Sequence, residues 1–192
     1  MYGPVIAGSC FRLRPPRQDD AAAMIGWFED LEVTARLARR FPLSLDEEQE
    51  WLRQTATDAN SVYWVIEYEG RLIGGTSIGG IDWANGHGTT GTVIGDKTVW
   101  GKRIGSEVMR LRADFAFREL PLRKLQSGYL DGNEASRRAQ AAAGYREVGR
   151  WSKHHFREGR WLDHILTELM REDWESLPPL AAGAPARPSG LL

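Results

Sequence analysis

Residues 99–117 read VWGKRIGSEVMRLRADFAF, and the domain is built around this stretch. It contains the end of a strand, a turn with two glycines, and an amphipathic helix. One helical face is apolar, because apolar residues recur at i, i+4, i+7 and i+11, namely Ile104, Val108, Leu111 and Phe115. Glycine lets the main chain approach a ligand, and free N–H groups at a helix start attract anions. The turn therefore predicts a phosphate site, although an ordinary strand-to-helix loop has the same local pattern.

The residues that follow this helix extend the pattern. A strand over residues 125–130 leads to NEAS at residues 133–136, which opens a second helix that GY ends at residues 144–145. Together with the turn, these motifs resemble the GNAT acetyltransferases, and within them the Rim-type group that acetylates ribosomal-protein N-termini. That group carries a WGKGxGxE turn, an NxxS helix start, a GF or GY ending and a later G-x-x-x-D hairpin, matched here by Gly159 and Asp163. The matches keep the family order along nearly the whole chain.

The resemblance implies a single α/β GNAT-like domain over residues 1–175. A shift in composition to Pro, Ala and Gly predicts a flexible C-terminal tail over residues 176–192. It also implies a sheet that splays between its fourth and fifth strands, with the pantetheine arm of acetyl-coenzyme A (acetyl-CoA) in the gap. The turn is expected to hold the pyrophosphate through backbone amides. The residues implied in binding this cosubstrate are Ile94, Gly95, Gly101, Lys102, Arg103, Ile104, Gly105, Ser106 and Asn133.

Patterning along the chain predicts a mixed central sheet of about seven strands with about four helices. Two Glu-Gly turns, at residues 69–70 and 158–159, predict β-hairpins. Ser44 and Glu47 predict a capping box at a helix start. Three further segments are predicted from weaker patterns: a short helix over residues 32–39, a loop over residues 82–91 and a strand over residues 92–99.

Length, charge and cysteine content limit the classes of protein to consider. The 192 residues fit one domain with a sizeable core. A net charge of −1 argues against a general binder of nucleic acid or of a membrane surface. The single cysteine, Cys10, excludes an internal disulfide and suits a reducing compartment. No membrane-spanning run or signal peptide is evident, so we expect a cytoplasmic protein.

Two positions depart from the family pattern. Arg103 replaces the first glycine of the Gly-x-Gly pair, so its φ angle is expected to be negative or strained. Its guanidinium could contact phosphate directly or could signal weakened cosubstrate binding. Many family members also carry a tyrosine general acid seven residues after the asparagine of NxxS. That position is Gln140 here, as in Rim-type relatives that lack the tyrosine, so the usual proton donor is missing.

Acetyl transfer from a thioester to an amine needs a base and an oxyanion donor. Our candidate base is His155, on the penultimate strand, where Rim-type relatives can place a glutamate; an unperturbed histidine titrates near ~6.5. Strand alternation is expected to turn His154 to the opposite face, so that only one of the two sees the cleft. Surface positions for both histidines are the alternative. A backbone N–H near Ile94 and Gly95 is the expected oxyanion donor.

The departing thiolate needs a proton, and Ser136 is the candidate acid by resemblance to Rim-type enzymes that use the serine of NxxS. Alternatively, Ser136 only completes the helix start after Asn133, which we interpret as a cosubstrate contact and a helix cap. His87 is a weaker candidate base because loop histidines are commonly just solvated. Asp163, beside His164, is expected to be structural. No His/Cys/Asp spacing indicates a metal site.

These features favour an N-acetyltransferase that moves acetyl from acetyl-CoA to a primary amine by direct attack. An α-amine has a pKa of ~7.7–8.0 against ~10.4 for lysine, which slightly favours a protein N-terminus as the acceptor. Acids at residues 29–30 and 46–48 leave a polyamine open, and an antibiotic amine is a further alternative. A catalytically silent acyl-CoA-binding or regulatory module is the alternative from another class.

The resemblance also makes a homodimer reasonable. The tail, otherwise suited to solvent, carries apolar residues that we expect to pack against the parent domain or a neighbouring subunit: Leu177, Leu180, Leu191 and Leu192.

Overall fold

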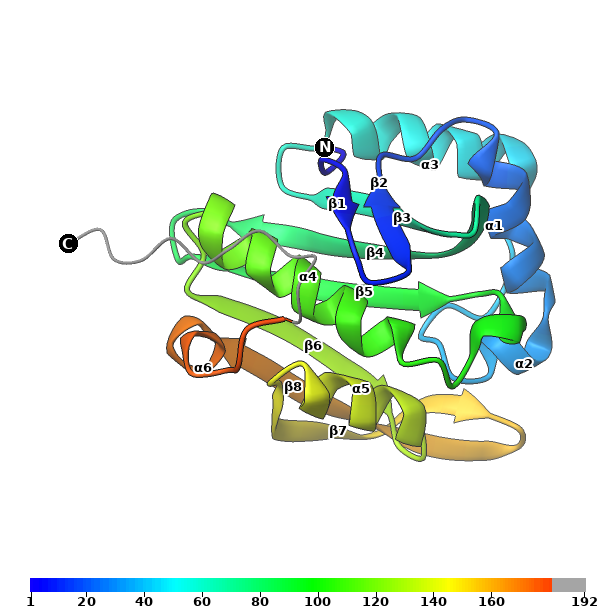
Figure 1. Cartoon of the computed structure of the whole chain (residues 1–192). Helices are drawn as coiled ribbons and strands as arrows, with labels where there is room; N and C mark the ends of the chain where they lie inside the picture. The colour runs from blue at the N-terminus through cyan, green and yellow to red at the C-terminus, as the bar shows by residue number, and fades with distance from the viewer. Residues whose placement is uncertain (181–192) are drawn as a thin grey trace.

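The computed structural model describes residues 1–180, which form a mixed α/β domain around one eight-stranded sheet (Figure 1). The strand order is β1-β2-β3-β4-β5-β6-β8-β7, and only β5 and β6 pair in parallel. The α/β prediction is confirmed, with one strand more than expected, the two-residue β1. The strands are β1 (Ile6–Ala7), β2 (Phe11–Arg14), β3 (Val62–Tyr68), β4 (Arg71–Asp82), β5 (His87–Ile94), β6 (Lys124–Leu130), β7 (Arg146–Arg157) and β8 (Arg160–Met170).

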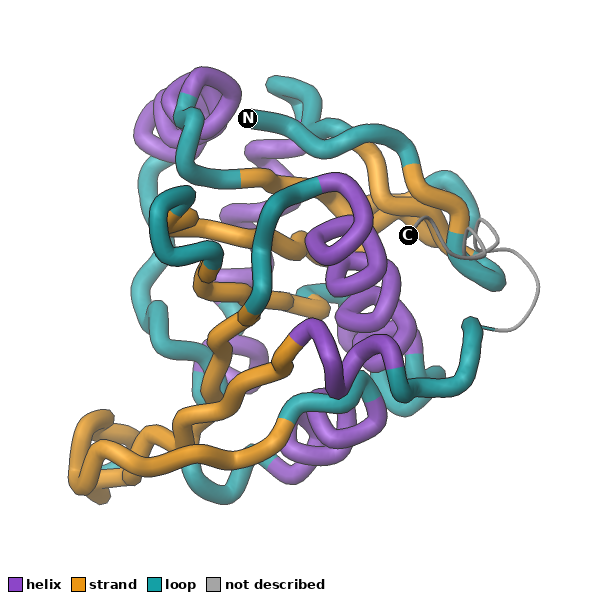
Figure 2. Tube along the Cα trace, turned by 90° about the vertical axis from the view of Figure 1, so that its left-hand side faces the viewer, coloured by secondary structure: helices purple, strands orange, loops and turns teal. Residues whose placement is uncertain are grey.

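Helices cover both faces of the sheet, as the edge-on view in Figure 2 shows. They are α1 (Asp20–Glu29), α2 (Leu31–Thr34), α3 (Leu45–Thr57), α4 (Ile104–Glu119), α5 (Glu134–Ala142) and α6 (Arg171–Glu175), with a 3-10 turn, η1 (Lys97–Val99). The large hydrophobic cluster lies under α4, and a smaller one lies under α1 and α3. Successive side chains of β3 point to opposite faces of the sheet, so Trp64 belongs to the large cluster and Val65 to the smaller one. No helix within residues 1–180 is long and apolar enough to cross a membrane.

Two predicted segments differ from the structure. The helix expected over residues 32–39 ends at Thr34, where Leu37 N donates to Thr34 O and the i→i−4 bonds stop. The carbonyl groups that follow accept hydrogen bonds from side chains of other elements. Arg157 donates to Leu37 O and Ala38 O, and Asn133 donates to Arg36 O. The capping box of Ser44 and Glu47 is present as expected.

The loop predicted over residues 82–91 is shorter in the structure. Asp82 accepts hydrogen bonds from the main chain and side chain of Asn85, which closes a turn, and β5 begins at His87. The strand predicted over residues 92–99 therefore starts earlier and ends at Ile94. Threonines at positions 89, 90 and 92 are β-branched and suit a strand, so the polar composition of this segment was misleading.

Strands β5 and β6 separate soon after they meet, which confirms the expected splay. Their parallel register covers three pairs, and the last is Thr89 with Gln126. One residue further, side chains replace the ladder: Thr90 Oγ1 donates to Gln126 O at 3.0 Å, and Ser127 Oγ donates to Thr90 O at 3.1 Å. Beyond this point the described residues of the two strands no longer pair with each other. We call this gap the β5–β6 opening.

The chain after α6 packs back onto its own domain. Leu177 and Leu180 contact the large hydrophobic cluster, and Arg110 of α4 donates to Pro178 O at 2.6 Å. The prediction that apolar tail residues pack against the parent domain is confirmed for these two leucines. Leu191 and Leu192 lie outside the described residues.

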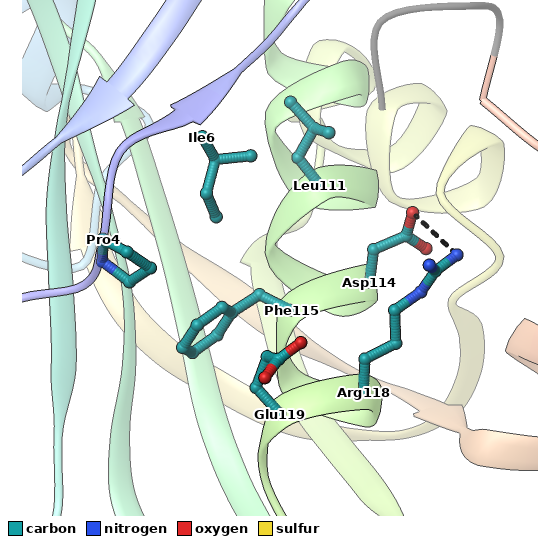
Figure 3. Close-up of a pocket in the computed structure, with 7 residues that line it drawn as sticks. All are labelled: Pro4, Ile6, Leu111, Asp114, Phe115, Arg118 and Glu119. Carbon is teal, nitrogen blue, oxygen red and sulfur yellow. Dashed lines mark ion pairs between the residues drawn. The ribbon is translucent and has the colours of Figure 1, made fainter. Parts of the chain in front are cut away.

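A groove of about 230 Å³ lies between the N-terminal segment and the outer side of α4 (Figure 3). Its floor is mainly apolar, and the rim carries the Asp114–Arg118 ion pair. The groove lies beside β1, at the edge of the sheet opposite β7, so it is separate from the β5–β6 opening. Its lining residues are Pro4, Ile6, Leu111, Asp114, Phe115, Arg118 and Glu119.

A buried ion-pair network fixes the start of α1 to the sheet. Arg14 of β2 donates two hydrogen bonds of 2.8 Å to Asp20 and one of 2.6 Å to Glu67 of β3. Burial alone would raise the pKa of Asp20, but hydrogen bonds from Arg14 and the Arg17 amide hold that pKa below its ordinary value. Likewise, burial alone would raise the pKa of Glu67, but hydrogen bonds from Arg14 and Arg12 hold that pKa below its ordinary value.

We predict that Arg14→Leu lowers the free energy of unfolding at pH 7 by about 3 kcal/mol, because it leaves two carboxylates without their buried cation. The native carboxylates have depressed pKa values, so their pairing stabilises the fold above the unfolded pKa and is lost as the pH falls. The difference between wild type and variant should therefore shrink below about pH 4. Urea unfolding at several pH values measures this difference.

Arg12→Leu is the matched control. Arg12 also contacts Glu67, but its side chain is 52% exposed, so its loss should cost under about 1 kcal/mol. Equal losses for the two variants would contradict the role of the buried network.

Candidate active site

The turn before α4 presents backbone donors at the mouth of the β5–β6 opening. Trp100 Nε1 donates to Ile94 O at 2.9 Å and so ties the turn to the end of β5. Gly101 has a φ of 81°, which suits glycine. The first i→i−4 bond of α4 runs from Glu107 N to Arg103 O, so the N–H groups of residues 104–106 have no acceptor within the helix. The expected anion site therefore has its backbone donors in place.

The side chains of the turn leave room for an anion. A Cβ atom added at Gly105 would meet only Ile94 Cγ1, at 3.9 Å. Lys102 Nζ lies 5.0 Å from the centre of the Tyr68 ring, and the Lys102 and Arg103 side chains are exposed. Two cations therefore flank the free amides.

Arg103 adopts the left-handed conformation, with φ 62° and ψ 8°. The sequence predicted that φ of Arg103 would be either negative or strained. The first alternative is wrong, and the second is confirmed. A non-glycine residue in this region costs about 1–2 kcal/mol. The turn thus keeps the backbone path that a glycine would take, and the Arg103 side chain makes no capping hydrogen bond to it.

The register of β5 decides which N–H groups face the opening. Gly95 N donates to Ile73 O at 2.9 Å, so Ile73 and Gly95 form a hydrogen-bonded pair of the β4–β5 ladder. In an antiparallel ladder such pairs alternate with pairs whose N–H and C=O groups point away from the partner strand. Ile94 and Thr92 belong to that second set, because they lie opposite Gly74 and Thr76. The prediction that Gly95 offers its N–H is therefore wrong, and Ile94 keeps this role as a proposal.

Gly95 instead makes room for an aromatic side chain. A Cβ at this position would lie 2.0 Å from Cγ of Trp27, the α1 residue whose ring covers the end of β5. Ion pairs of 2.7 and 2.8 Å from Lys97 to Asp30 and Glu32 also hold the α1–α2 junction beside η1. Sequence reasoning missed Trp27 as a neighbour of the opening, and only its aromatic character in a half-buried helix could have indicated it.

His155 lies on β7, the edge strand, and belongs to a cluster with His154, His164 and Trp151. His155 Nε2 and His164 Nδ1 are 3.0 Å apart. The His154 ring centre is 4.8 Å from that of His155 and 5.9 Å from that of His164. The expectation that His154 and His155 point to opposite faces is wrong, because a bulge between Trp151 and His155 breaks the alternation.

Asp163 holds this bulge. It accepts a hydrogen bond of 2.8 Å from Lys153 N, where φ is 49°, and one of 3.2 Å from Arg150 Nη1. These contacts fit the structural role expected of Asp163. His87 lies at the closed end of β5, 3.7 Å from Asp82, and is remote from the opening.

Two histidines of the cluster have perturbed acidities. Burial, aided by the neighbouring His164, His154 and Arg157, lowers the pKa of His155 below its ordinary 6.5. Burial and His154 likewise lower the pKa of His164. Both imidazoles are therefore mainly neutral at pH 7 and able to accept a proton.

On the other face of the sheet, Ser136 lies in the first turn of α5. Asn133 caps this helix by accepting a hydrogen bond from Ser136 N, and its side-chain N–H₂ donates to Arg36 O. Both ends of the Asn133 amide are thus engaged, which supports the cap and leaves the cosubstrate contact a proposal. Ser136 Oγ accepts a hydrogen bond of 3.1 Å from Gln140 Nε2.

Gln140 occupies the position of the missing tyrosine and is almost fully buried. Its Nε2 also donates to Gly128 O of β6, and its Oε1 accepts from Thr167 of β8 at 2.5 Å. It therefore links α5 to the strands beside the opening. Among residues 1–180 no acceptor takes the Ser136 hydroxyl proton, so this hydroxyl can donate to a bound group.

Comparison with known proteins agrees with this geometry. A model of the acetyltransferase (GNAT) domain matches residues 11–146. The chain is 30% identical over 126 residues to the putative ribosomal N-acetyltransferase YdaF of Bacillus subtilis, a match that covers 66% of this chain and 68% of that protein. It is 35% identical over 80 residues to the probable N-acetyltransferase YjcK of the same organism, which covers 42% of this chain and less than half (44%) of YjcK.

Among solved structures, spermidine N-acetyltransferase from Vibrio cholerae in complex with CoA and spermine is similar with a TM-score of 0.81. Its sequence identity is 18%, and the match covers 88% of this chain and all (100%) of that one. Mycobacterium smegmatis RimJ in complex with CoA-disulfide is similar with a TM-score of 0.74 at 23% identity, over 89% of this chain and 87% of that one.

We predict that Gly105→Val abolishes the rise in melting temperature that acetyl-CoA gives to the wild type. The valine methyl groups would crowd the N–H groups of residues 104–106, while the open space around Gly105 lets the fold persist. Thermal unfolding with and without millimolar cosubstrate measures both effects. Gly79→Ala, in β4 with nothing within 4 Å of its added Cβ, is the control and should keep the full shift. An undiminished shift in Gly105→Val would place the binding site elsewhere.

Proposed function

The chain belongs to the GNAT acetyltransferase family, and we propose that it moves the acetyl group of acetyl-CoA directly to a primary amine. The observation that carries this proposal is the β5–β6 opening, with the N–H groups of residues 104–106 at its mouth. Acetyl-CoA, the cosubstrate of this family, supplies an activated thioester when it is bound. In the proposal, the residues that hold it are Ile94, Gly101, Lys102, Arg103, Ile104, Gly105, Ser106 and Asn133.

The reaction forms one C–N bond and breaks one C–S bond. The neutral amine attacks the thioester carbonyl, and the N–H group of Ile94 stabilises the oxyanion from β5. Where a single such donor has been removed from an enzyme, the cost is about 3–4 kcal/mol. The amine then gives up a proton to the histidine pair that contains His155. Ser136 donates a proton to the departing CoA thiolate and regains a proton from solvent.

Charges around the histidine cluster favour an α-amine over a polyamine. Lys97 neutralises Asp30, and Glu47 is engaged in its capping box. Glu48 is buried, and burial raises the pKa of its carboxyl. These three are among the acids that left a polyamine open, and the other two, Glu29 and Asp46, are exposed. By contrast, Arg157 lies beside Arg40, and no ion pair within 4.0 Å is present at either residue in the described chain. A polycation is repelled by this arrangement, whereas one neutral α-amine is not.

The second candidate function, a catalytically silent acyl-CoA-binding module, has one observation in its favour. Gln140 stands where many relatives carry a tyrosine acid, and its amide is fully engaged in structural hydrogen bonds. Protonation of the thiolate then depends on a serine hydroxyl, which is a poor acid. A module of this kind would bind acetyl-CoA and turn over no amine.

We also keep the proposals of a cytoplasmic location and a homodimer. The long edge strand β7 carries exposed Val148, Trp151 and Phe156. Exposed edges of this kind invite pairing with a second chain unless they are covered.

The proposal predicts thiol release from acetyl-CoA with peptides that have a free α-amine. We expect kcat/KM for such peptides to exceed that for spermidine by at least about tenfold at pH 7.5, because roughly a quarter to two fifths of the α-amine is neutral there, against about 0.1% of an alkylamine with a pKa near 10.4. The same peptides with an acetylated N-terminus are the control and should give no thiol. A preference for spermidine would overturn the acceptor class. Stabilisation by acetyl-CoA without turnover of any peptide, polyamine, amino acid or aminoglycoside would favour the silent module.

A further inference from the structure

We propose that the base that meets the acceptor amine is His164, and that His155 acts through it as a proton relay. This inference rests on the proposed acetyl transfer and refines its base. It follows from the order of the strands, the close contact of His164 with β6, and the face of the sheet on which the imidazole lies.

Strand order separates the two histidines by their distance from the β5–β6 opening. From β6, which borders the opening, the sheet continues to β8 and then to β7. Neighbouring strands are about 4.8 Å apart, so the backbone of His155 lies about 10 Å from β6, with β8 between them. His164 is on β8, directly beside β6, where it pairs with Leu130. The residue nearer to the opening is thus His164.

The His164 ring reaches over β6 itself. A Cβ atom added at Gly128 would lie 2.3 Å from His164 Nε2 and 3.1 Å from its Cδ2, so the imidazole rests on this glycine. Gly128 comes two residues after Gln126, the last residue of β6 that pairs with β5. The Nε2 atom therefore lies over the part of β6 that borders the opening. The absence of a side chain at residue 128 makes this position possible.

The alternation of side chains along β8 shows on which face of the sheet the His164 imidazole lies. Thr167 of β8 bonds to Gln140 of α5, so Thr167 points to the face that α4 and α5 cover. His164 is three residues earlier, and alternation along β8 turns it to the opposite face, the face of α1 and Trp27. Ser136 lies on α5. The base and the acid therefore stand on opposite faces of the sheet, which lets the amine approach from one side while the thiolate leaves on the other.

The contact between the two imidazoles can pass a proton on. With His164 protonated on Nδ1, its N–H donates across the 3.0 Å to His155 Nε2, and His164 Nε2 keeps a free lone pair. When the amine loses its proton to Nε2, the Nδ1 proton moves to His155, which releases its extra proton to solvent at the sheet edge. Proton count and charge balance at each step.

The charged surroundings keep this pair ready to accept a proton. From β7, His154 disfavours a positive charge on both rings, and Arg157 does so on His155. The Asp163 carboxylate is occupied by Lys153 N and Arg150, and β6 contributes no titratable side chain at Gly128. None of these neighbouring residues is therefore a free carboxylate that would stabilise the protonated form of the histidine pair.

Single substitutions to glutamine separate the two roles. We expect His164→Gln to lower kcat for an α-amine peptide by about 100-fold or more and to remove the acidic limb of the pH profile of kcat/KM. His155→Gln should cost at most about tenfold and keep that limb, because His164 still accepts the proton. His154→Gln, in the same cluster, is the matched control and should stay near wild type. Imidazole added to His164→Ala should restore part of the lost rate, which a purely structural histidine would not allow.

Two results would overturn the inference while leaving the proposed function intact. One is wild-type kinetics and pH profile in His164→Gln. The other is the reverse order, with the larger loss and the missing limb in His155→Gln. Each variant should keep the stabilisation by acetyl-CoA, which shows that the fold and the cosubstrate site persist. Failure of the proposed function is distinct, because the wild type itself would then turn over no amine.

Discussion

The backbone hydrogen bonds that β5 and β6 do not make with each other are the constraint on which the rest of this structure depends. Buried N–H and C=O groups need partners, so strands that diverge must be supported in another way. The side chains of Thr90 and Ser127 make the last hydrogen bonds between the two strands, and Trp100 Nε1 donates a hydrogen bond to the carbonyl group of Ile94. What remains on the open side of β5 is a set of donors suited to a ligand that enters between the strands.

A buried cation holds α4 against this opened strand. Arg112 is almost fully buried, and its Nη1 donates to the hydroxyl groups of Thr76 and Thr92 and to Gly91 O, at 2.7–2.8 Å. Its Nη2 lies 3.3 Å from the hydroxyl of Tyr145, which in turn is 3.1 Å from Thr90 Oγ1. One side chain thus joins α4, β4, β5 and the start of β7 near the closed end of the opening. Because α4 begins in the turn, this network also fixes the backbone donors of residues 104–106 relative to β5.

The roles proposed for the two histidines and Ser136 depend on how the sheet brings together residues that are far apart in sequence. Residues from β7, β8 and α5 meet near β6 only because β8 lies between β6 and β7 in the sheet. Gln140 contacts both β6 and β8, so it holds the α5 side of this arrangement while His164 lies on the other side. Gln140 is thus a structural contact between α5 and the sheet.

Local patterns were enough to predict the α/β class, the turn before α4, the Ser44 capping box and the hairpins, because each depends on residues close together in sequence. The helix over residues 32–39, the start of β5, the free N–H of Gly95 and the opposite faces of His154 and His155 were mispredicted. Two of these depend on a residue of another strand: Ile73 for Gly95, and Asp163 for the bulge beside His155. The other two depend on local turns, in which Asn85 donates to Asp82 and Leu37 N donates to Thr34 O. Spacing in a sequence gives the face of a regular strand, but register and bulges are fixed only when strands pair. The tertiary structure alone therefore decided which N–H groups of β5 point away from β4 and which imidazole lies on the strand next to β6.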